Sequence, residues 1–500
     1  MFGQKVALGA ALIGLFQLLA KFMDLIATII LARLLLPEDF GLVAIAVAVL
    51  LITNSITELP VVDVLVQREE LDHRDIDTAF TLTFLRGLLV AGVTASLAYP
   101  VAQFYTDDRL IPIMLVLALV PIAQGLNSPA MIHFMRQIKY GPTARAALIG
   151  KGCGVITTIL LALAGASYWA LIANLVVTPI GVMLTTHIMA PYRPRFRTQG
   201  ARAILSFAGW VTVSRIIWTL NMQADRFLIG RILGKSTLGQ YAMGGDISSM
   251  ATYAVAGPIL QPIFSGFSRI QGDMARMRAA YIKSQQTLIM LVLPLGVGLA
   301  AVANNLIPVL LGAGWEQTIP VIQWLAPMIA LQMMSVPVQS AAMALARPKA
   351  LAWRELLGLL LRLPATLVAA WYWGLIGAVV ARSLTGLVII LLNLTIARGL
   401  VGVPLRRQLL AGWRSYCSAL LMVGVVWGLD RIIGHDALPM PALIAGQIFF
   451  GGLTYVGSHM ALWFCAKRPG GSEQFLLDLV RSRGKKAGAP ASPDQMNGAN

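Results

Sequence analysis

Long apolar stretches recur along the whole chain and are separated by short polar connections. A helix needs about 20 apolar residues to cross the hydrocarbon core of a bilayer, and the stretches are of that order. They are continuous and do not alternate with period 2, which excludes the strands of a membrane barrel. The pattern predicts an all-α polytopic membrane protein with about 14 transmembrane helices. The predicted helices cover residues 8–31, 40–60, 79–104, 110–133, 146–166, 168–190, 203–225, 237–264, 285–306, 318–346, 350–372, 374–397, 411–430 and 440–465.

The chain contains an internal repeat. Residues 31–44 (LARLLLPEDFGLVA) align without gaps on residues 229–242 (IGRILGKSTLGQYA), so that Gly41 falls on Gly239. The two segments are six predicted helices apart, and a shift by an even number of helices preserves the orientation in the membrane. The repeat is therefore a parallel one, related by an axis along the membrane normal.

This repeat predicts two six-helix lobes followed by two extra helices. We expect an N-terminal lobe of helices 1–6 at residues 1–198 and a C-terminal lobe of helices 7–12 at residues 199–400. Helices 13 and 14 lie at 401–468, and residues 469–500 form a cytoplasmic tail that is disordered at its end. Two lobes that face each other across a cavity are typical of alternating-access transporters.

Composition supports a membrane protein and removes most enzyme classes. Of the 500 residues, 57% are hydrophobic and 12% are charged, with a mean hydropathy of +0.75. Ordinary domains carry about 25% charged residues. The three cysteines stand alone and the five histidines are scattered, so neither a disulfide framework nor a metal site is predicted. No catalytic motif and no cofactor motif is found.

The net charge of +17 orients the protein rather than indicating nucleic-acid binding. With a cytoplasmic N-terminus, nearly all lysines and arginines of the connections fall on the cytoplasmic side, as the positive-inside rule requires. Both termini are then cytoplasmic. The cations on the opposite side are Arg33, Arg109, Arg226, Arg231, Lys235 and Arg431.

Charged residues inside membrane spans are costly and usually face protein or water. The basic residues within predicted helices are Lys21, Arg86, Lys151, Arg215, Arg362 and Arg382. Arg215 and Arg362 lie roughly 18 Å from the cytoplasmic ends of their helices at 1.5 Å per residue, which is near the bilayer midplane. Lys151 is placed close to the headgroups, where it can snorkel, and is set aside.

Acidic partners for these cations are few. Asp24 follows Lys21 by three residues, so the two share a helix face and can pair. Asp246 lies near the middle of its helix, whereas Asp225 lies towards the end of its own. Fixed cations among amides and hydroxyls suit an anionic, sugar-bearing substrate. The amide candidates for that cavity are Gln17, Asn54, Asn221 and Gln223.

A structural interpretation stands beside this functional one. A deep arginine can clamp the carbonyl groups of a helix end, and Lys21 with Asp24 can form a self-satisfied pair. Scattered serines and threonines often serve helix packing. The functional hypothesis depends on several cations gathering in one membrane interior without matching anions.

Several segments resemble, in the same order, those of the polysaccharide transporter family, the Wzx/ExoT-like branch of the multidrug/oligosaccharidyl-lipid/polysaccharide flippase superfamily. The resemblance covers roughly residues 20–400 and departs from the family pattern at 129–145. The segments that carry it are LARLLLPEDFGLVAIA (31–46), VLVQREELDHRDIDTAF (64–80), DRFLIGRILGKSTLGQYAM (225–243), PIFSGFSRIQGDMARMRAAYIKS (262–284), LLGAGWEQTIPVIQWLAP (310–327) and ALARPKAL (344–351).

The resemblance implies a transporter and not an enzyme. Members of this family flip oligosaccharide repeat units, carried on undecaprenyl pyrophosphate, from the cytoplasmic to the periplasmic leaflet for exopolysaccharide, capsule or O-antigen synthesis. It implies a multi-pass protein of the bacterial inner membrane, with membrane lipids around it and a polysaccharide polymerase or export machinery as partners. The family supplies no sharp motif, so the site residues rest on burial and charge alone.

Two alternatives stay open. The first is a drug/cation antiporter of the same superfamily, although the deep charges here are mainly positive. The second is a membrane enzyme of polysaccharide assembly, although the non-cytoplasmic connections are too short to hold a domain. For a flippase driven by H⁺ or Na⁺ exchange, Asp24 and Asp246 are the candidate coupling carboxylates.

Overall fold

A computed structural model of the chain describes residues 2–56, 72–137, 139, 141–197, 201–270, 272–345, 347, 349–433, 439–468 and 473–474. The side chains of residues 2–15, 17, 201–214, 258 and 261 are outside this description, as is most of the predicted tail. Within these ranges the chain is helical and contains no strand. The predicted all-α membrane fold is therefore confirmed.

The helices follow the apolar stretches of the sequence. They are α1 (Phe2–Leu34), α2 (Pro37–Ile56), α4 (His73–Ser96), α5 (Ala98–Tyr105), α6 (Leu110–Leu117), α7 (Leu119–Gly125), α8 (Ile132–Arg136), α9 (Gly141–Leu163), α10 (Tyr168–Met189), α11 (Ala201–Ile232), α12 (Lys235–Arg269), α13 (Met274–Leu311), α14 (Thr318–Gln332), α15 (Val336–Ala344), α16 (Lys349–Val401), α17 (Leu405–Leu409), α18 (Trp413–Ile433) and α19 (Met440–Cys465). Each of the predicted stretches overlaps at least one of them.

The number of membrane crossings stays a prediction. Among the described residues, nine helices are long and apolar enough to cross a membrane, or ten if the bent pair Leu110–Gly125 and Pro129–Arg136 forms one span. One of the nine is α16, whose 53 residues exceed the length that a single crossing needs.

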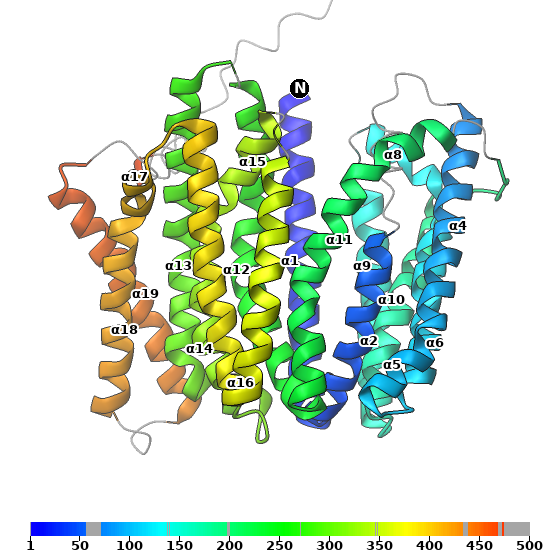
Figure 1. Ribbon diagram of the computed structural model, residues 1–500, viewed down its shortest axis with the longest axis horizontal. Coiled ribbons are helices and arrows are strands. Elements are labelled where there is room, and N and C mark those ends of the chain that lie inside the picture. Colours follow the sequence, from blue (N-terminus) through cyan, green and yellow to red (C-terminus); the bar gives the residue numbers. More distant parts are fainter. Residues whose placement is uncertain are drawn as a thin grey trace, which may run out of the picture. The chain divides into compact units, whose positions relative to one another are not determined.

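Helix α16 is a hairpin of two antiparallel arms that join at Gly374. Gly374 has φ of 62° and ψ of −146°, a backbone conformation that an L side chain rarely adopts. Gly358 lies against Ile389, and Gly377 lies against the backbone of Ala369. These contacts pair early residues of the helix with late ones, so the two arms run side by side (Figure 1). The two adjacent predictions, 350–372 and 374–397, correspond to these arms.

The tip of this hairpin is aromatic and exposed. Trp371, Tyr372 and Trp373 have 70%, 73% and 69% of their surface exposed. Trp and Tyr collect at the membrane–water interface, where their rings meet the headgroups. An aromatic tip of this kind is typical of a helix end at a membrane interface.

The chain divides into two compact units. Unit 1 is Met1–Ala254, Val302–Ile329 and Pro348–Leu392, and unit 2 is Val255–Ala301, Ala330–Arg347 and Asn393–Asn500. In unit 1 the core lies where α6 packs on α2 and α12, with Ile45, Leu110, Ile113, Met114 and Leu238 fully buried. The division into lobes at residues 198 and 199 follows the sequence repeat and stays a prediction.

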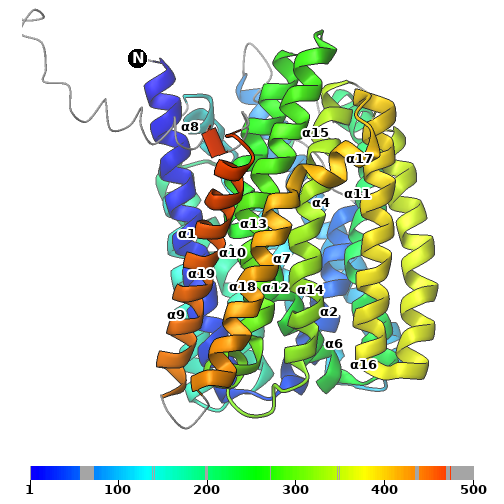
Figure 2. The same cartoon turned by 90° about the vertical axis from the view of Figure 1, so that its left-hand side faces the viewer.

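Unit 2 has its own core and its own polar ties. Tyr281 on α13 donates a hydrogen bond of 2.9 Å to Gln408 on α17. Helices α18 and α19 lie side by side (Figures 1 and 2). The Glu473 carboxylate lies 2.7 Å from Arg414 and 3.2 Å from His459, which joins the residues after α19 to this helix pair. Exposed Leu420 and Phe449 on these helices suit a lipid-facing surface.

Candidate functional site

A cluster of buried charges lies between α11 and the hairpin α16. Asp225 on α11 is fully buried. Its carboxylate pairs with the guanidinium of Arg382 on the second arm of α16 and accepts hydrogen bonds of 3.3 Å from Tyr241 and 3.4 Å from Thr366. Arg382 also donates to the Tyr241 hydroxyl at 2.9 Å. Three helices, α11, α12 and α16, therefore meet at one carboxylate.

A second group lies one helical turn away on α11. Arg362, on the first arm of α16, is 3% exposed and donates a hydrogen bond of 2.8 Å to the Asn221 carbonyl oxygen. The Asn221 amide donates to the Glu355 carboxylate at 2.9 Å, and Glu355 pairs with Arg354. The two groups are continuous because residues four apart on a helix share a face, as Asn221 and Asp225 do on α11.

Close packing brings these helices together. A Cβ atom at Gly358 would lie 3.1 Å from the Asn221 amide nitrogen and 3.2 Å from Ile389. Small residues allow helices in membranes to approach closely. Gly358 therefore lets α11 and both arms of α16 converge around the buried charges.

Positive charge exceeds negative charge in this cluster. Among the described side chains, the three guanidinium groups of Arg354, Arg362 and Arg382 lie with the two carboxylates of Asp225 and Glu355, and these five side chains together carry one excess positive charge. Arg362 forms no ion pair with any described residue, and its Nε has no hydrogen-bond partner among them. A buried cation without a direct ion-pair partner is costly, which makes Arg362 the functional candidate of the cluster.

The position of Arg362 along the hairpin bears on its depth. It lies roughly 18 Å along the first arm from Gly374 at 1.5 Å per residue, and the aromatic tip is typical of an interface. Half of a hydrocarbon core of about 30 Å is about 15 Å. The placement of Arg362 near the bilayer midplane is consistent with this length and stays a prediction.

The first predicted repeat contains a different pair. Asp24 on α1 pairs with Lys151 on α9, and not with Lys21, which is exposed. Lys151 lies in the middle of α9, which extends from Gly141 to Leu163, and its placement near the headgroups stays a prediction. The side chains of Asp24 and Lys151 are 36% and 19% exposed.

The other predicted site residues have separate surroundings among the described residues, and their place in a common cavity stays a prediction. Arg86 on α4 donates hydrogen bonds of 3.2 Å to the carbonyl and amide oxygens of Asn54 near the end of α2, which is the clamp expected of a structural arginine. Asp246 pairs with Arg226 at 2.7 Å and is largely exposed. Arg215 is exposed on α11. Gln223 is half-buried, and the side chain of Gln17 is outside the described residues.

The sequence predicts two cations of the cluster, Arg362 and Arg382, but it misses Arg354 and most of the partners of these side chains. It places Asp225 only towards a helix end and does not select Tyr241 or Thr366. It also overlooks Glu355, which lies within the predicted helix 350–372 next to Arg354. An acidic residue inside an apolar stretch is the signal that could find it. Arg382 has the carboxylate partner Asp225, whereas Arg362 forms no ion pair with a described residue, and the substrate role of these cations stays a prediction.

Comparison with known proteins decides the family. A model of a family described as polysaccharide biosynthesis protein matches residues 30–320, which is more than half of the chain. The chain belongs to this family. The resemblance to polysaccharide transporters is thereby confirmed.

Relatives of the polysaccharide biosynthesis family align over much of the chain. The lipopolysaccharide biosynthesis protein WzxC of Escherichia coli is 24% identical over 82% of this chain and 85% of its own length. The succinoglycan biosynthesis transport protein ExoT of Rhizobium meliloti is 27% identical over 59% of this chain and 60% of its own length. The structure is similar to that of the lipid II flippase MurJ in an inward closed conformation, with a TM-score of 0.73, 14% identity, and coverage of 92% of this chain and 100% of that one. The similarity to MurJ shows a shared fold and carries no conclusion about function.

Proposed function

We propose that the protein flips undecaprenyl-pyrophosphate-linked oligosaccharide repeat units from the cytoplasmic to the periplasmic leaflet, for exopolysaccharide, capsule or O-antigen synthesis. The match of residues 30–320 to the polysaccharide biosynthesis family is the observation that carries this proposal. The names of two relatives, a lipopolysaccharide biosynthesis protein and a succinoglycan transport protein, point to the same substrate class and favour a transporter over an enzyme.

The buried cluster supports an anionic substrate. A pyrophosphate is an anion with many acceptor oxygens, and guanidinium groups bind such oxygens through charge-assisted hydrogen bonds. Arg362 carries the excess charge of the cluster near the midplane, and its Nε lacks a partner among the described residues. We assign to Arg362 the neutralisation of the pyrophosphate during its passage, while the polyprenyl chain stays in lipid.

The pair of Asp24 and Lys151 is our candidate for energy coupling. Its side chains are partly exposed and the pair is held by a single ion-pair contact, so a proton or a cation can exchange with it. Asp246, the other carboxylate considered, is largely exposed and pairs with Arg226. A variant Asp24→Asn that retained full coupled transport would remove this role.

We also propose the orientation and surroundings that the basic connections predict. Both termini lie in the cytoplasm, the protein is a component of the bacterial inner membrane, and the two sequence repeats form the lobes of an alternating-access transporter. A polysaccharide polymerase or export complex would take up the flipped units on the far side.

Reconstitution in liposomes tests the proposed function. A fluorescent undecaprenyl-pyrophosphate oligosaccharide is placed in one leaflet, and its movement is followed with and without a pH gradient. A cationic dye is assayed in parallel. We expect protein-dependent movement of the lipid-linked sugar. Transport of the dye alone, by folded protein, would favour the antiporter, and chemical conversion of the lipid-linked sugar would favour an enzyme.

A further inference from the structure

The two sequence repeats meet backbone to backbone in unit 1. A Cβ atom at Gly41 would overlap the carbonyl oxygen of Lys235, and a Cβ atom at Gly239 would overlap the carbonyl oxygen of Pro37. The contact is symmetric, because the repeat alignment places Gly41 on Gly239 and Pro37 on Lys235. The first turns of α2 and α12 therefore cross at the two glycines, where only the absence of a side chain permits such an approach.

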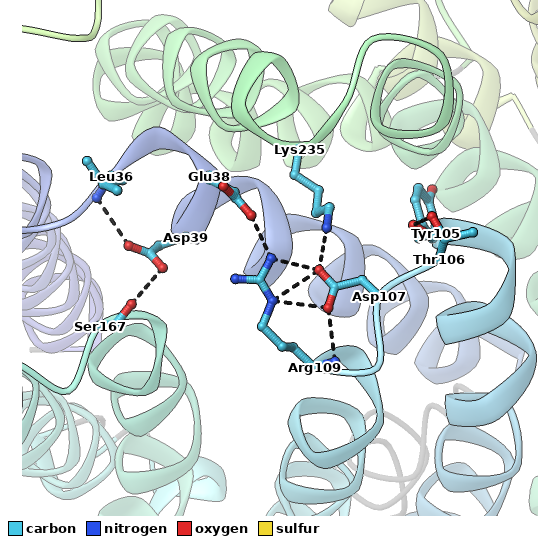
Figure 3. Close-up of polar contacts among 9 residues, drawn as sticks. All are labelled: Leu36, Glu38, Asp39, Tyr105, Thr106, Asp107, Arg109, Ser167 and Lys235. Carbon is cyan, nitrogen blue, oxygen red and sulfur yellow. Dashed lines mark hydrogen bonds and ion pairs between the residues drawn. The ribbon is translucent and has the colours of Figure 1, made fainter.

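A network of charges surrounds this crossing (Figure 3). Asp107, in the connection between α5 and α6, accepts hydrogen bonds of 2.8 to 3.1 Å from the Arg109 guanidinium and pairs with the ammonium group of Lys235 at the start of α12. Arg109 also pairs with Glu38 on α2 at 2.6 Å. Lys235 comes from the second repeat and the other three residues come from the first, so the pair of Asp107 and Lys235 is the ionic link between the repeats in this network.

The position of Lys235 is unfavourable unless it is paired. The N-terminus of a helix carries partial positive charge, which disfavours a lysine in the first turn. The Asp107 side chain is 6% exposed and that of Lys235 is 22% exposed, whereas Arg109 and Glu38 are 42% and 46% exposed. The ion pair of Asp107 and Lys235 therefore contributes more to the stability of the crossing than the ion pair of Arg109 and Glu38, because water and salt screen exposed ion pairs.

The pKa of Asp107 follows from these contacts. Burial would raise it, but the hydrogen bonds from Arg109 and Lys235 outweigh burial and lower the pKa to about 2. Asp107 is therefore ionised at every physiological pH.

Further contacts join the repeats at the same end of unit 1. The Trp315 indole donates to the Ala32 carbonyl oxygen at 2.9 Å, and Tyr105 donates to the Phe227 carbonyl oxygen at 3.0 Å. Arg33 donates to the carbonyl oxygens of Val309 and Leu310 near the end of α13. The bonds to the carbonyl oxygens of Ala32, Val309 and Leu310 satisfy helix-end groups that have no partner within their own helices.

We propose that Asp107 and Lys235 form the ion-pair lock of an outer gate, and that Gly41 and Gly239 form its closing surface. The proposal rests on the proposed function, since a gate has meaning only in a transporter. With cytoplasmic termini, this end of unit 1 faces the periplasm, so the structure has the gate closed. Release of substrate requires the two helix starts to separate, and the separation breaks the pair of Asp107 and Lys235. Arg109 is a positioning residue, because it holds the Asp107 carboxylate and ties it to Glu38.

Spin labels on the two sides of the crossing test the lock. Asp108 and Ser236 are exposed neighbours of the pair and are replaced by labelled cysteines, in a chain whose native Cys153, Cys417 and Cys465 are changed to serine. A second pair of labels at Asp108 and Ala164 stays within the first repeat and reports unrelated changes. Distances are measured by electron paramagnetic resonance in lipid nanodiscs.

We expect variants of the Asp107–Lys235 pair to open the crossing and a variant of the Arg109–Glu38 pair to leave it closed. Lys235→Glu places like charges together and should raise the long-distance population of the Asp108–Ser236 labels by on the order of tenfold, with the in-repeat distance unchanged. The double variant Asp107→Lys with Lys235→Glu should restore most of the short-distance population. Glu38→Gln, the matched control, should leave the distribution near that of the wild type.

Two other outcomes decide against the lock. A wild-type distribution in both Lys235→Glu and the milder Lys235→Gln would overturn it, and so would opening that the double variant fails to reverse in folded protein.

A transport experiment keeps the two proposals distinct. If the wild type flips lipid-linked sugar, a disulfide between the two cysteines of the variant Asp108→Cys with Ser236→Cys should stop transport until reductant is added. Undiminished transport by the cross-linked protein would contradict the gate. If the wild type flips none, the proposed function fails while the distances still decide the lock.

Discussion

Two ion pairs of unit 1 are of the same kind but have different surroundings. Asp225 with Arg382 and Asp24 with Lys151 each join a carboxylate on the first helix of a predicted repeat to a cation on another helix. Asp225 is fully buried and receives two further hydrogen bonds from hydroxyl groups. Asp24 is 36% exposed and has the single partner Lys151 in the contacts that the structure defines.

The difference indicates which pair can change during transport. Removing one partner of a buried and fully hydrogen-bonded ion pair leaves an uncompensated charge, which is strongly destabilising. A partly exposed pair loses little when it breaks, because water replaces the partner. We therefore expect the pair of Asp225 and Arg382 to be a fixed anchor for α11, α12 and α16, and we propose that the pair of Asp24 and Lys151 opens and exchanges an ion.

The largest effect is expected for the anchor. Asp225→Asn leaves Arg382 buried beside Arg362 without a carboxylate partner and should lower the stability by about 3–5 kcal/mol. Thermal unfolding of the purified protein, followed by size-exclusion chromatography after heating, measures this loss. The double variant Asp225→Asn with Arg382→Gln should recover part of the stability. An unchanged unfolding temperature in the single variant would mean that the pair is not an anchor.

A smaller loss is expected at the crossing of the repeats. Gly41→Ala places a methyl group on the Lys235 carbonyl and should cost about 1–3 kcal/mol, as overpacking does. It should also shift the outer-gate labels towards long distances. Gly92→Ala is the matched control, because no atom lies within 4 Å of a Cβ at Gly92. Equal behaviour of the two variants would argue against a tight crossing.

The pair of Asp24 and Lys151 should be important for energy coupling but should contribute little to stability. Asp24→Asn should cost about 0–1 kcal/mol, the usual value for an exposed ion pair, but should make transport insensitive to an imposed ion gradient. Flipping by the variant is measured with and without the gradient, and Asp246→Asn serves as the comparison. If Asp24→Asn proved as destabilising as Asp225→Asn, the contrast between the two pairs would be lost.

The smallest effect is expected when pH is varied, because Asp107 in the proposed outer gate stays ionised. The folded-state pKa of Asp107 is lowered to about 2, below the ordinary value of 3.8. Its contribution to closure is therefore complete above the ordinary value and is lost only as the pH falls towards 2. The short-distance population of the gate labels should stay constant between about pH 5 and 8. A marked opening within this range would show that another group controls the gate.

Sequence predicts the helices well because apolar length is a local property. It also aligns Gly41 with Gly239, the residues at the crossing of α2 and α12. The pairing of Asp225 with Arg382 could not be predicted, because the two residues are 157 positions apart and meet only through helix packing. The predicted partner of Asp24 is wrong for a related reason. A shared helix face makes Lys21 the local choice, whereas the packing of α1 on α9 brings Lys151 to the carboxylate.

The most direct test of the account is the flipping of lipid-linked oligosaccharide by Arg362→Gln, compared with Arg215→Gln. Both arginines lie within helices, but Arg362 is buried in the charge cluster and Arg215 is exposed. The account predicts movement by the wild type and by Arg215→Gln, and a loss of at least about tenfold for Arg362→Gln, equivalent to about 1.4 kcal/mol. Full flipping by folded Arg362→Gln would contradict the assignment of the buried cluster to the substrate.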